Sequence, residues 1–293
     1  MAISSSHKTS GREHALDDET LLTRKTIFRP DMLTGHRVAI SGGGSGIGKA
    51  AAILFARLGA NVAICGRRAE TLALTGELIH KATGRSVFQQ VLSIRDPEAV
   101  ESFISEVHEH LGGIDTLINN AGGQFPQNAI DISRKGWLAV IDTNLNGTWW
   151  MMQEAAKAWR DRGQPGNIVN VVLNVERGTP QVSHTCAARA GVIYLSKTLS
   201  VEWTPFNIKV NCLAPGATAT EGFRMYPPET IEHFKTNPMK STSDAFEMAE
   251  ALVYMSSPAT AFMNGALVII DGGQAQWGTT WPAGRPDYYS GQG

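Results

Sequence analysis

The sequence predicts an α/β fold in a single domain, built on a doubly wound parallel sheet of about seven strands with helices on both faces. Short runs rich in β-branched and aliphatic residues alternate along the chain with amphipathic stretches of helix length. Such alternation is typical of parallel strands joined by crossover helices. With 293 residues, 42% of them hydrophobic, the chain can bury one sizeable core without a second domain. The expected strands are residues 37–40, 61–65, 86–88, 116–118, 167–172, 209–213 and 267–270.

The folded domain is expected to span residues 36–273. Residues 1–35 are polar and charged without a clear period, which predicts an N-terminal extension. Residues 274–293 form a C-terminal tail that carries several aromatic side chains among glycines. Because exposed aromatic surface is costly, this tail is expected to pack over its own site or a neighbouring subunit. A partly ordered tail is the alternative.

Composition and charge exclude several classes of protein. The chain has 26 basic and 27 acidic residues and a formal net charge of −1. It therefore lacks the excess of positive charge that attracts nucleic acid. Its three cysteines, Cys65, Cys186 and Cys212, have neither disulfide-framework nor metal-ligand spacing. No stretch approaches the ~20 apolar residues of a membrane span, and the polar start does not resemble a signal peptide. We therefore expect a cytoplasmic protein with no metal, membrane or nucleic-acid partner.

A glycine-rich segment at residues 41–48 follows the first expected strand and opens a helical run. Without Cβ atoms, the backbone of such a turn can approach a pyrophosphate, and the helix N-terminus offers free N–H groups and partial positive charge. An ordinary tight turn is the alternative, but the strand before it and the helix after it favour dinucleotide binding. The candidate cofactor-binding residues here are Ser41, Gly42, Ser45, Gly46, Ile47 and Gly48.

Two arginines, Arg67 and Arg68, follow the second expected strand, about 20 residues past the glycines. An acidic residue at this place would accept hydrogen bonds from a free ribose 2′-hydroxyl. Guanidinium groups suit a 2′-phosphate instead, because they offer paired donors and permanent charge. The predicted cofactor is therefore NADP(H). Solvated arginines at the start of a helix are the alternative.

Further motifs follow in order: Asn-Asn-Ala-Gly at residues 119–122, Asn144 with Leu-Asn-Gly-Thr after it, Asn-Cys-Leu-Ala-Pro-Gly at 211–216, and Asp-Gly-Gly at 271–273. Together with the glycine motif they resemble the short-chain dehydrogenase/reductase family over about residues 33–273. The resemblance implies a Rossmann-type sheet and a homo-oligomer, a dimer or tetramer, formed through the helices around Asn144 and Arg189. It also implies cofactor contacts from Asn120, Ala121, Gly122, Pro215, Gly216 and Thr218.

The usual catalytic set of this family is Asn, Ser, Tyr and Lys. Asn144 matches the first position, but Val172 and Leu173 occupy both plausible places for the serine. Thr185 stands at the tyrosine position and Arg189 at the lysine position. Arg189 can still hold the cofactor ribose, whereas an aliphatic alcohol is a poor proton donor compared with a phenol. The resemblance therefore implies an intact cofactor half with an atypical catalytic half.

Residues 184–192 resemble a divergent branch that includes peroxisomal trans-2-enoyl-CoA reductases and bacterial citronellol/citronellal dehydrogenase-like proteins, with 2,4-dienoyl-CoA reductases as more distant relatives. Hydride addition to an enoyl thioester gives an enolate, which needs an oxyanion stabiliser and later a proton at carbon. His184 is a candidate to relay that proton and Thr185 to bind the substrate. A packed histidine and a helix-cap hydroxyl are the respective alternatives.

Residues 217–240 mix aromatic, methionine and proline side chains, which suits a lid over an apolar or acyl-CoA substrate; a packed surface loop is the alternative.

The leading hypothesis for the function is an NADPH-dependent reductase of an activated C=C bond in an enoyl-CoA-like substrate. Carbonyl or alcohol chemistry on a terpenoid-like substrate is a second hypothesis. A catalytically silent NADP(H)-binding subunit or sensor is a third.

Overall fold

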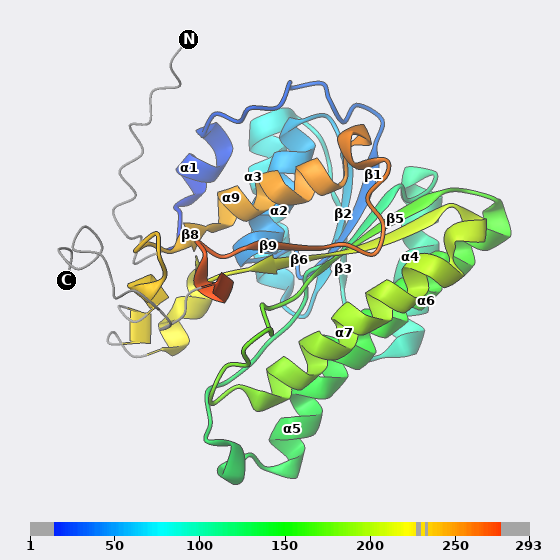
Figure 1. Ribbon diagram of the computed structural model, residues 1–293. Coiled ribbons are helices and arrows are strands. Elements are labelled where there is room, and N and C mark those ends of the chain that lie inside the picture. The colour runs from blue at the N-terminus through cyan, green and yellow to red at the C-terminus, as the bar shows by residue number, and fades with distance from the viewer. Residues whose placement is uncertain (1–14, 227–229, 232–233, 277–293) are drawn as a thin grey trace.

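A computed structural model of the chain describes residues 15–226, 230–231 and 234–276 (Figure 1). The start of the N-terminal extension, part of the expected lid and most of the aromatic tail lie outside the described residues.

A seven-stranded parallel sheet forms the centre of the molecule, which confirms the predicted fold class. The strands lie in the order β3-β2-β1-β4-β5-β6-β9, so the winding direction reverses between β1 and β4. In such sheets ligands bind beyond the carboxyl ends of the strands at the point of reversal. The strands are β1 (Arg37–Ser41), β2 (Asn61–Gly66), β3 (Phe88–Val91), β4 (Thr116–Asn119), β5 (Gly166–Val171), β6 (Ile208–Pro215) and β9 (Leu267–Ile270).

The third strand lies later in the sequence than predicted. Residues 86–88 were expected, but β3 begins at Phe88 and continues to Val91. β3 is an edge strand that pairs with β2 alone in this sheet, and its residues alternate between half-buried and exposed. A half-exposed strand needs few apolar residues, so its boundaries are weakly marked in the sequence. A short parallel pair of β7 (Thr218–Ala219) and β8 (Ser243–Asp244) was not predicted.

Helices cover both faces of the sheet (Figure 1). On one face α2 packs between α3 and α9, with α1 beside them; on the other α4 packs on α6, and α7 contacts β6 and α5. Within the described part of the chain, no helix is both long and apolar enough to cross a membrane. The helices are α1 (Asp18–Thr23), α2 (Gly46–Arg57), α3 (Ala69–Thr83), α4 (Pro97–Leu111), α5 (Arg134–Ile141), α6 (Gly147–Arg162), α7 (Ser183–Glu202) and α9 (Ala245–Met255).

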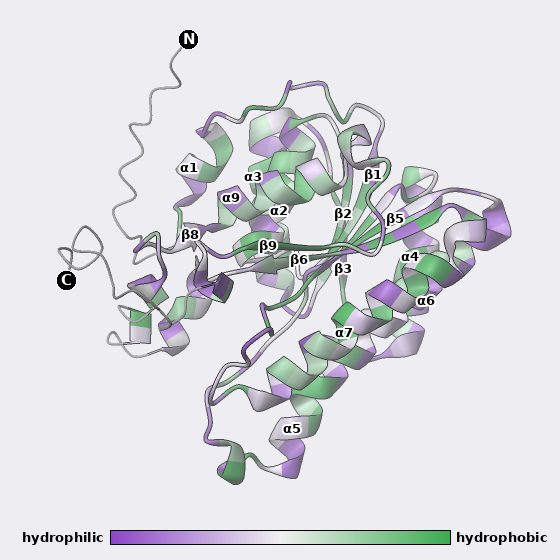
Figure 2. Cartoon of the chain, viewed as in Figure 1, coloured by the Kyte–Doolittle hydropathy of each residue, from purple (hydrophilic) through white to green (hydrophobic). Residues whose placement is uncertain are grey.

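Two large hydrophobic clusters hold these layers together. One joins β1 and β2 to α2 and α9 through side chains such as Phe55 and Phe246. The other joins the sheet to α4 and α6 and includes Phe103 and Trp159. The indole of Trp159 is fully buried and donates a 2.6 Å hydrogen bond to the carbonyl oxygen of Ile114. Figure 2 shows the strands of the sheet largely in hydrophobic colours, as expected for strands buried on both faces.

The described part of the N-terminal extension packs against the sheet domain. Leu21 and Leu33 are buried in the same cluster as α2. Arg24 forms a 2.6 Å ion pair with Asp244, whose carboxylate is completely buried at the start of α9. Arg57 of α2 donates hydrogen bonds to the carbonyl oxygens of Leu21 and Arg24. Side-chain contacts therefore attach the described part of the extension to α2 and to the start of α9.

His108 of α4 gives the fold a predicted sensitivity to acid. The side chain is 6% exposed and its Nε2 atom has no hydrogen-bond partner among the described residues. Burial lowers the pKa of His108 to about 4, with the positive charges of Arg162 and Arg37 acting in the same direction and Asp115 opposing them. Because the unfolded chain takes up a proton near pH 6.5, the stability contributed by neutral His108 is complete above that pH and is lost as the pH falls toward 4.

We expect the free energy of unfolding to fall by about 2 kcal/mol between pH 7 and pH 5 through this one group. Urea denaturation of the wild type and of His108→Gln at both pH values measures the effect. The variant should lose less stability on acidification than the wild type. Equal losses in the two proteins would show that His108 does not titrate in this range.

Candidate cofactor cleft and active site

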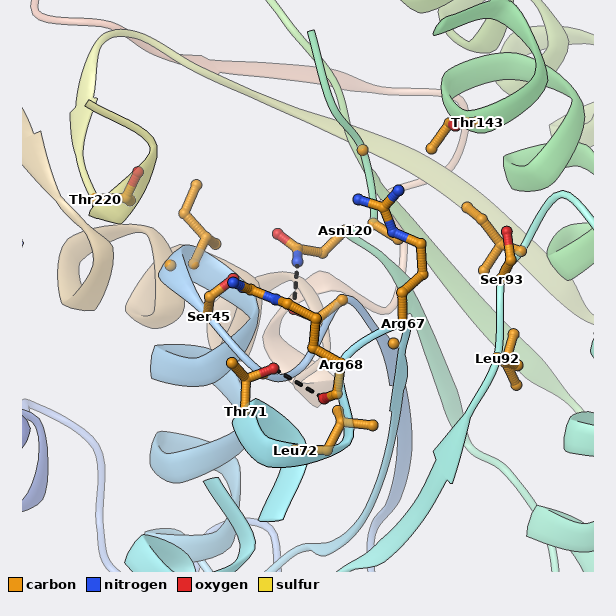
Figure 3. Close-up of a pocket in the computed structure, with 18 residues that line it drawn as sticks. Ser45, Arg67, Arg68, Thr71, Leu72, Leu92, Ser93, Asn120, Thr143 and Thr220 are labelled. Carbon is orange, nitrogen blue, oxygen red and sulfur yellow. Dashed lines mark hydrogen bonds between the residues drawn. The ribbon is translucent and has the colours of Figure 1, made fainter. Parts of the chain in front are cut away.

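A cleft opens at the carboxyl ends of β1, β2, β3 and β4, where the winding direction of the sheet reverses. It has a volume of about 250 Å³. Figure 3 shows the glycine turn and the start of α2 on one side and Arg67, Ser93 and Thr143 on the other. Of the residues predicted to bind a cofactor, those that line the cleft are Gly42, Ser45, Gly46, Ile47, Arg67, Arg68, Asn120, Ala121 and Gly122. Those that do not line it are Ser41, Gly48, Arg189, Pro215, Gly216 and Thr218.

The glycine turn is packed too closely for a side chain at Gly48, and its backbone at Gly42 has a conformation that favours glycine. Gly42 has a φ of +71°, a conformation that favours glycine, and its N–H donates a 2.8 Å hydrogen bond to the carbonyl oxygen of Cys65. A Cβ atom on Gly48 would overlap the carbonyl oxygen of Gly42 and the amide of Asn120. Ser45 is the N-cap residue just before α2 and makes no side-chain capping bond. Its hydroxyl therefore remains available beside the helix N-terminus, which favours anions.

Ser41 and Asn120 support this turn from behind. Ser41 is fully buried, and its hydroxyl oxygen accepts hydrogen bonds from the N–H groups of Asn120 and Ala121. The Asn120 side chain donates to the carbonyl oxygens of Ser41 and Gly42 at 3.2 Å. These contacts tie the end of β1 to the end of β4. Ser41 therefore positions the walls of the cleft rather than facing into it.

Arg67 and Arg68 extend from the end of β2 over the cleft. Both are exposed, and neither side chain forms an ion pair or hydrogen bond with another described residue. In the view of Figure 3 the Arg68 side chain extends toward the turn that carries Ser45, and Arg67 extends away from it. Within the part of the chain that the structure describes, no carboxylate pairs with these two positive charges at the edge of the cleft.

Sequence reasoning missed an ionic network at the start of α2. The Glu221 carboxylate accepts a 2.9 Å hydrogen bond from the N–H of Gly46, and Lys49 lies 3.1 Å from Glu221 and 2.9 Å from Asp18. Burial favours the neutral acid, but the backbone hydrogen bonds and the Lys49 charge outweigh it and lower the pKa of Glu221. Lys49 therefore offsets the negative charge that Glu221 brings close to the anion-favouring helix N-terminus.

The segment after β6 enters the cleft through a residue that was not predicted. Thr218 pairs with Ser243 at 2.8 Å and donates to the carbonyl oxygen of Gly216, so its hydroxyl belongs to the β7 and β8 pair. Two residues later, Thr220 lines the cleft. Sequence pattern could not separate the two threonines, because residues two apart point to the same side of an extended chain.

Asn144 lies in a π-helical turn, Asp142–Asn146, between α5 and α6. Its side chain is 1% exposed. The amide group donates to the carbonyl oxygen of Gly123 at 2.9 Å and accepts from the N–H of Gly123 at 3.0 Å. Both polar atoms of Asn144 are therefore engaged by backbone, and they fix the loop that follows β4.

Arg189 of α7 lies directly behind this loop. It is 7% exposed, and its Nη1 donates a 3.3 Å hydrogen bond to the carbonyl oxygen of Asn144. A Cβ atom on Gly122 would overlap its guanidinium group. Burial lowers the pKa of Arg189 to about 10, so the group stays charged at neutral pH. The structure thus places a buried cation between Asn144 and the cleft residue Gly122.

His184 and Thr185 are 0% and 3% exposed at the start of α7. The His184 Nδ1 atom accepts a 2.8 Å hydrogen bond from the N–H of Thr185, and the imidazole packs edge-on against Phe125, with 4.6 Å between ring centroids. Burial lowers the pKa of His184 below its ordinary value, against the effect of a backbone hydrogen bond at Val182. The Nε2 atom is buried without a partner among the described residues. His184 is therefore neutral near pH 7.

Tyr226 reaches the loop after β4 from the segment that follows Thr220. Its hydroxyl accepts a 2.6 Å hydrogen bond from the side-chain amide of Gln124. Its ring packs edge-on against Phe234, which also contacts Phe223. The composition of residues 217–240 predicted an apolar cover but not this polar contact, because pairing between distant segments leaves no local signal.

A reversal point in a parallel sheet, a glycine turn at a helix N-terminus and two arginines at the end of the second strand are features of a Rossmann-type fold. Residues 42–275 match a family model described as enoyl-(acyl carrier protein) reductase. The chain belongs to the short-chain dehydrogenase/reductase family, and it is an oxidoreductase of that family.

Relatives named 2,4-dienoyl-CoA reductase match most of the chain. Peroxisomal 2,4-dienoyl-CoA reductase of Mus musculus is 33% identical over 274 residues, which are 91% of this chain and 92% of the relative. Probable 2,4-dienoyl-CoA reductase of Bacillus subtilis is 35% identical over 251 residues, which are 84% of this chain and 98% of the relative. Among solved structures, the citronellol catabolism dehydrogenase of Pseudomonas aeruginosa is similar with a TM-score of 0.76 and 36% identity, covering 86% of this chain and 99% of that one.

Proposed function

We propose that the protein is an NADPH-dependent reductase of an activated C=C bond in an enoyl-CoA-like thioester. One combination of features carries this proposal. The cleft bears two exposed arginines that pair with no described carboxylate, and Thr185 and Arg189 occupy the family's usual catalytic positions. The similarity to 2,4-dienoyl-CoA reductases over most of the chain supports the same chemistry.

The residues of the cleft fit NADPH. Arg67 and Arg68 would hold the 2′-phosphate, because both are exposed and neither pairs with a carboxylate of the described residues. The N–H groups at the start of α2 other than that of Gly46, which donates to Glu221, would hold the pyrophosphate. The glycines of the turn have no Cβ atoms, so the backbone there can come close to it. Arg189, behind Gly122, would stabilise the ribose side of the site. The bound cofactor supplies a hydride, and these residues bind and orient it.

The catalytic end suits enolate chemistry better than carbonyl reduction. Thr185 is an aliphatic alcohol and His184 is neutral and buried, so neither is a strong acid at the site. Reduction of an enoyl thioester requires donors that stabilise an enolate oxygen rather than a strong acid at that oxygen. The aromatic contacts among Phe223, Tyr226 and Phe234 provide an apolar wall of the kind that an acyl chain would contact.

A second candidate is alcohol or carbonyl chemistry on an apolar, terpenoid-like substrate. The similarity to a citronellol catabolism dehydrogenase favours it.

We further propose that the protein works in the cytoplasm as a homo-oligomer joined through α6 and α7. Tyr194 and Val201 of α7 are 69% and 74% exposed, which is consistent with a surface that another subunit covers.

NADPH consumption by the purified protein tests the proposal with a short enoyl-CoA, a medium enoyl-CoA, a dienoyl-CoA, citronellal and a simple ketone. We expect turnover of the thioesters and little of the carbonyls. Turnover of citronellal alone would favour the second candidate. Tight NADPH binding without consumption of any substrate would favour a silent cofactor-binding subunit and contradict both.

A further inference from the structure

Reduction of a C=C bond needs a proton as well as a hydride, and the residues at the family's usual catalytic positions do not provide an evident donor. Thr185 is 3% exposed, and its hydroxyl lies 3.4 Å from the Nδ1 atom of His184. The imidazole of His184 is packed against Phe125 and is fully buried. A donor from another element would complete the site.

The Tyr226 hydroxyl is hydrogen-bonded to the loop after β4, residues 120–128, which carries the cleft residue Gly122 and is called the active-site loop below. Gln124, which donates to it at 2.6 Å, directly follows Gly123, whose backbone Asn144 binds through two hydrogen bonds. Consecutive Cα atoms are about 3.8 Å apart. The phenol is therefore tied to a residue adjacent to the backbone that Asn144 fixes, on the same loop as the cleft residue Gly122.

The hydroxyl is also free to give up its own proton. A tyrosine O–H can accept one hydrogen bond and donate another. Tyr226 accepts from Gln124, and none of the described residues accepts a hydrogen bond from it. Its ring is held at 5.2 Å from that of Phe234, so the hydroxyl position is fixed from two sides.

The other tyrosines in the described part of the chain lie elsewhere. Tyr194 is 69% exposed on α7, where its ring contacts Lys197, and Tyr254 is 44% exposed on α9. Neither forms a side-chain hydrogen bond with a residue of the loop after β4. Among the described residues, Tyr226 is thus the phenol that reaches the active-site loop.

We propose that Tyr226 is the proton donor of the reaction, an inference that rests on the proposed function. The hydride forms a C–H bond at one carbon of the C=C bond, and the π electrons move onto the thioester as an enolate. The O–H bond of Tyr226 then breaks and its proton forms the second C–H bond at the α-carbon. The phenolate regains a proton from solvent, so the sum is one hydride and one proton added to the double bond.

Tyr226→Phe tests this role, with Tyr254→Phe as the matched control because it removes the same hydroxyl from a remote exposed site. We expect Tyr226→Phe to lower kcat for enoyl-CoA reduction by at least about 10-fold, with water partly replacing the phenol. The dissociation constant for NADPH, measured by fluorescence, should stay within about twofold of the wild type, since Tyr226 does not line the cofactor cleft. Tyr254→Phe should change neither quantity.

The outcomes separate this inference from the proposed function. If Tyr226→Phe reduces enoyl-CoA as fast as the wild type, the role of Tyr226 is wrong and the proposed function stands. If the wild type reduces carbonyls only, the proposed substrate is wrong, and a loss of that turnover in Tyr226→Phe would still support Tyr226 as donor, with its proton delivered to the alkoxide oxygen. A wild type that binds NADPH and reduces nothing would overturn both.

Discussion

Gly48→Ala is expected to weaken NADPH binding by at least about 100-fold, because its methyl group would overlap the carbonyl oxygen of Gly42 and the side chain of Asn120. The turn and the start of α2 would have to move apart, and a displacement of about 1 Å at a preorganised site is enough for an effect of this size. Fluorescence titration with NADPH measures the change, and circular dichroism checks that the variant is folded.

Gly112→Ala is the matched control for this experiment. Gly112 follows α4 with a φ of +73°, and a Cβ atom there would meet nothing within 4 Å. The replacement should lower stability by about 1 kcal/mol through backbone strain without touching the cleft. If Gly112→Ala weakened NADPH binding as much as Gly48→Ala, loss of stability rather than loss of the turn would explain the result.

The double variant Arg67→Ala, Arg68→Ala is expected to lose NADPH affinity by roughly 100-fold to 10,000-fold while NADH affinity changes little. Each hydrogen bond from a charged group contributes about 1.5–3 kcal/mol, and the double variant removes two such partners of the 2′-phosphate. Calorimetric titration with the two cofactors gives both affinities. The ratio of the NADPH affinity to the NADH affinity is the most direct measure of how the protein distinguishes the two cofactors.

Arg160→Ala, Arg162→Ala controls for net charge. These arginines lie in the last turn of α6, and the double replacement removes the same two charges from a site that does not line the cleft. It should leave the ratio of the two affinities unchanged. An unchanged ratio in Arg67→Ala, Arg68→Ala would instead show that these side chains are only solvated, and the choice of NADPH would be wrong.

Much of the fold was predictable because its signals are local. The glycine motif between a strand and a helix predicted the turn at the carboxyl end of β1, and the alternation of apolar runs predicted the seven strands. The edge strand β3 was placed too early, because a half-exposed strand does not need a continuous apolar run. Local pattern therefore predicted the layers better than it predicted the boundary of a strand at the edge.

Sequence pattern indicated which residues line the cleft mainly where they are continuous in the chain. Four of the residues predicted in the glycine segment and the arginine pair line it, Ser41 and Gly48 do not, and Thr220 lines it where Thr218 was predicted. The Glu221 contact with Gly46 and the Tyr226 contact with Gln124 join segments more than 100 residues apart. Spacing carries no information about such contacts, because they depend on where the segment after β6 folds back onto the sheet.

Transfer of deuterium from NADPH labelled at C4 of the nicotinamide ring tests the central claim most directly. The purified protein would be incubated with the labelled cofactor and a 2,4-dienoyl-CoA or trans-2-enoyl-CoA, and the product analysed by mass spectrometry. We predict a thioester with one double bond fewer and one deuterium on a carbon of the acyl chain. An unlabelled, unchanged thioester, together with deuterium on the carbinol carbon when citronellal is supplied, would contradict the assignment.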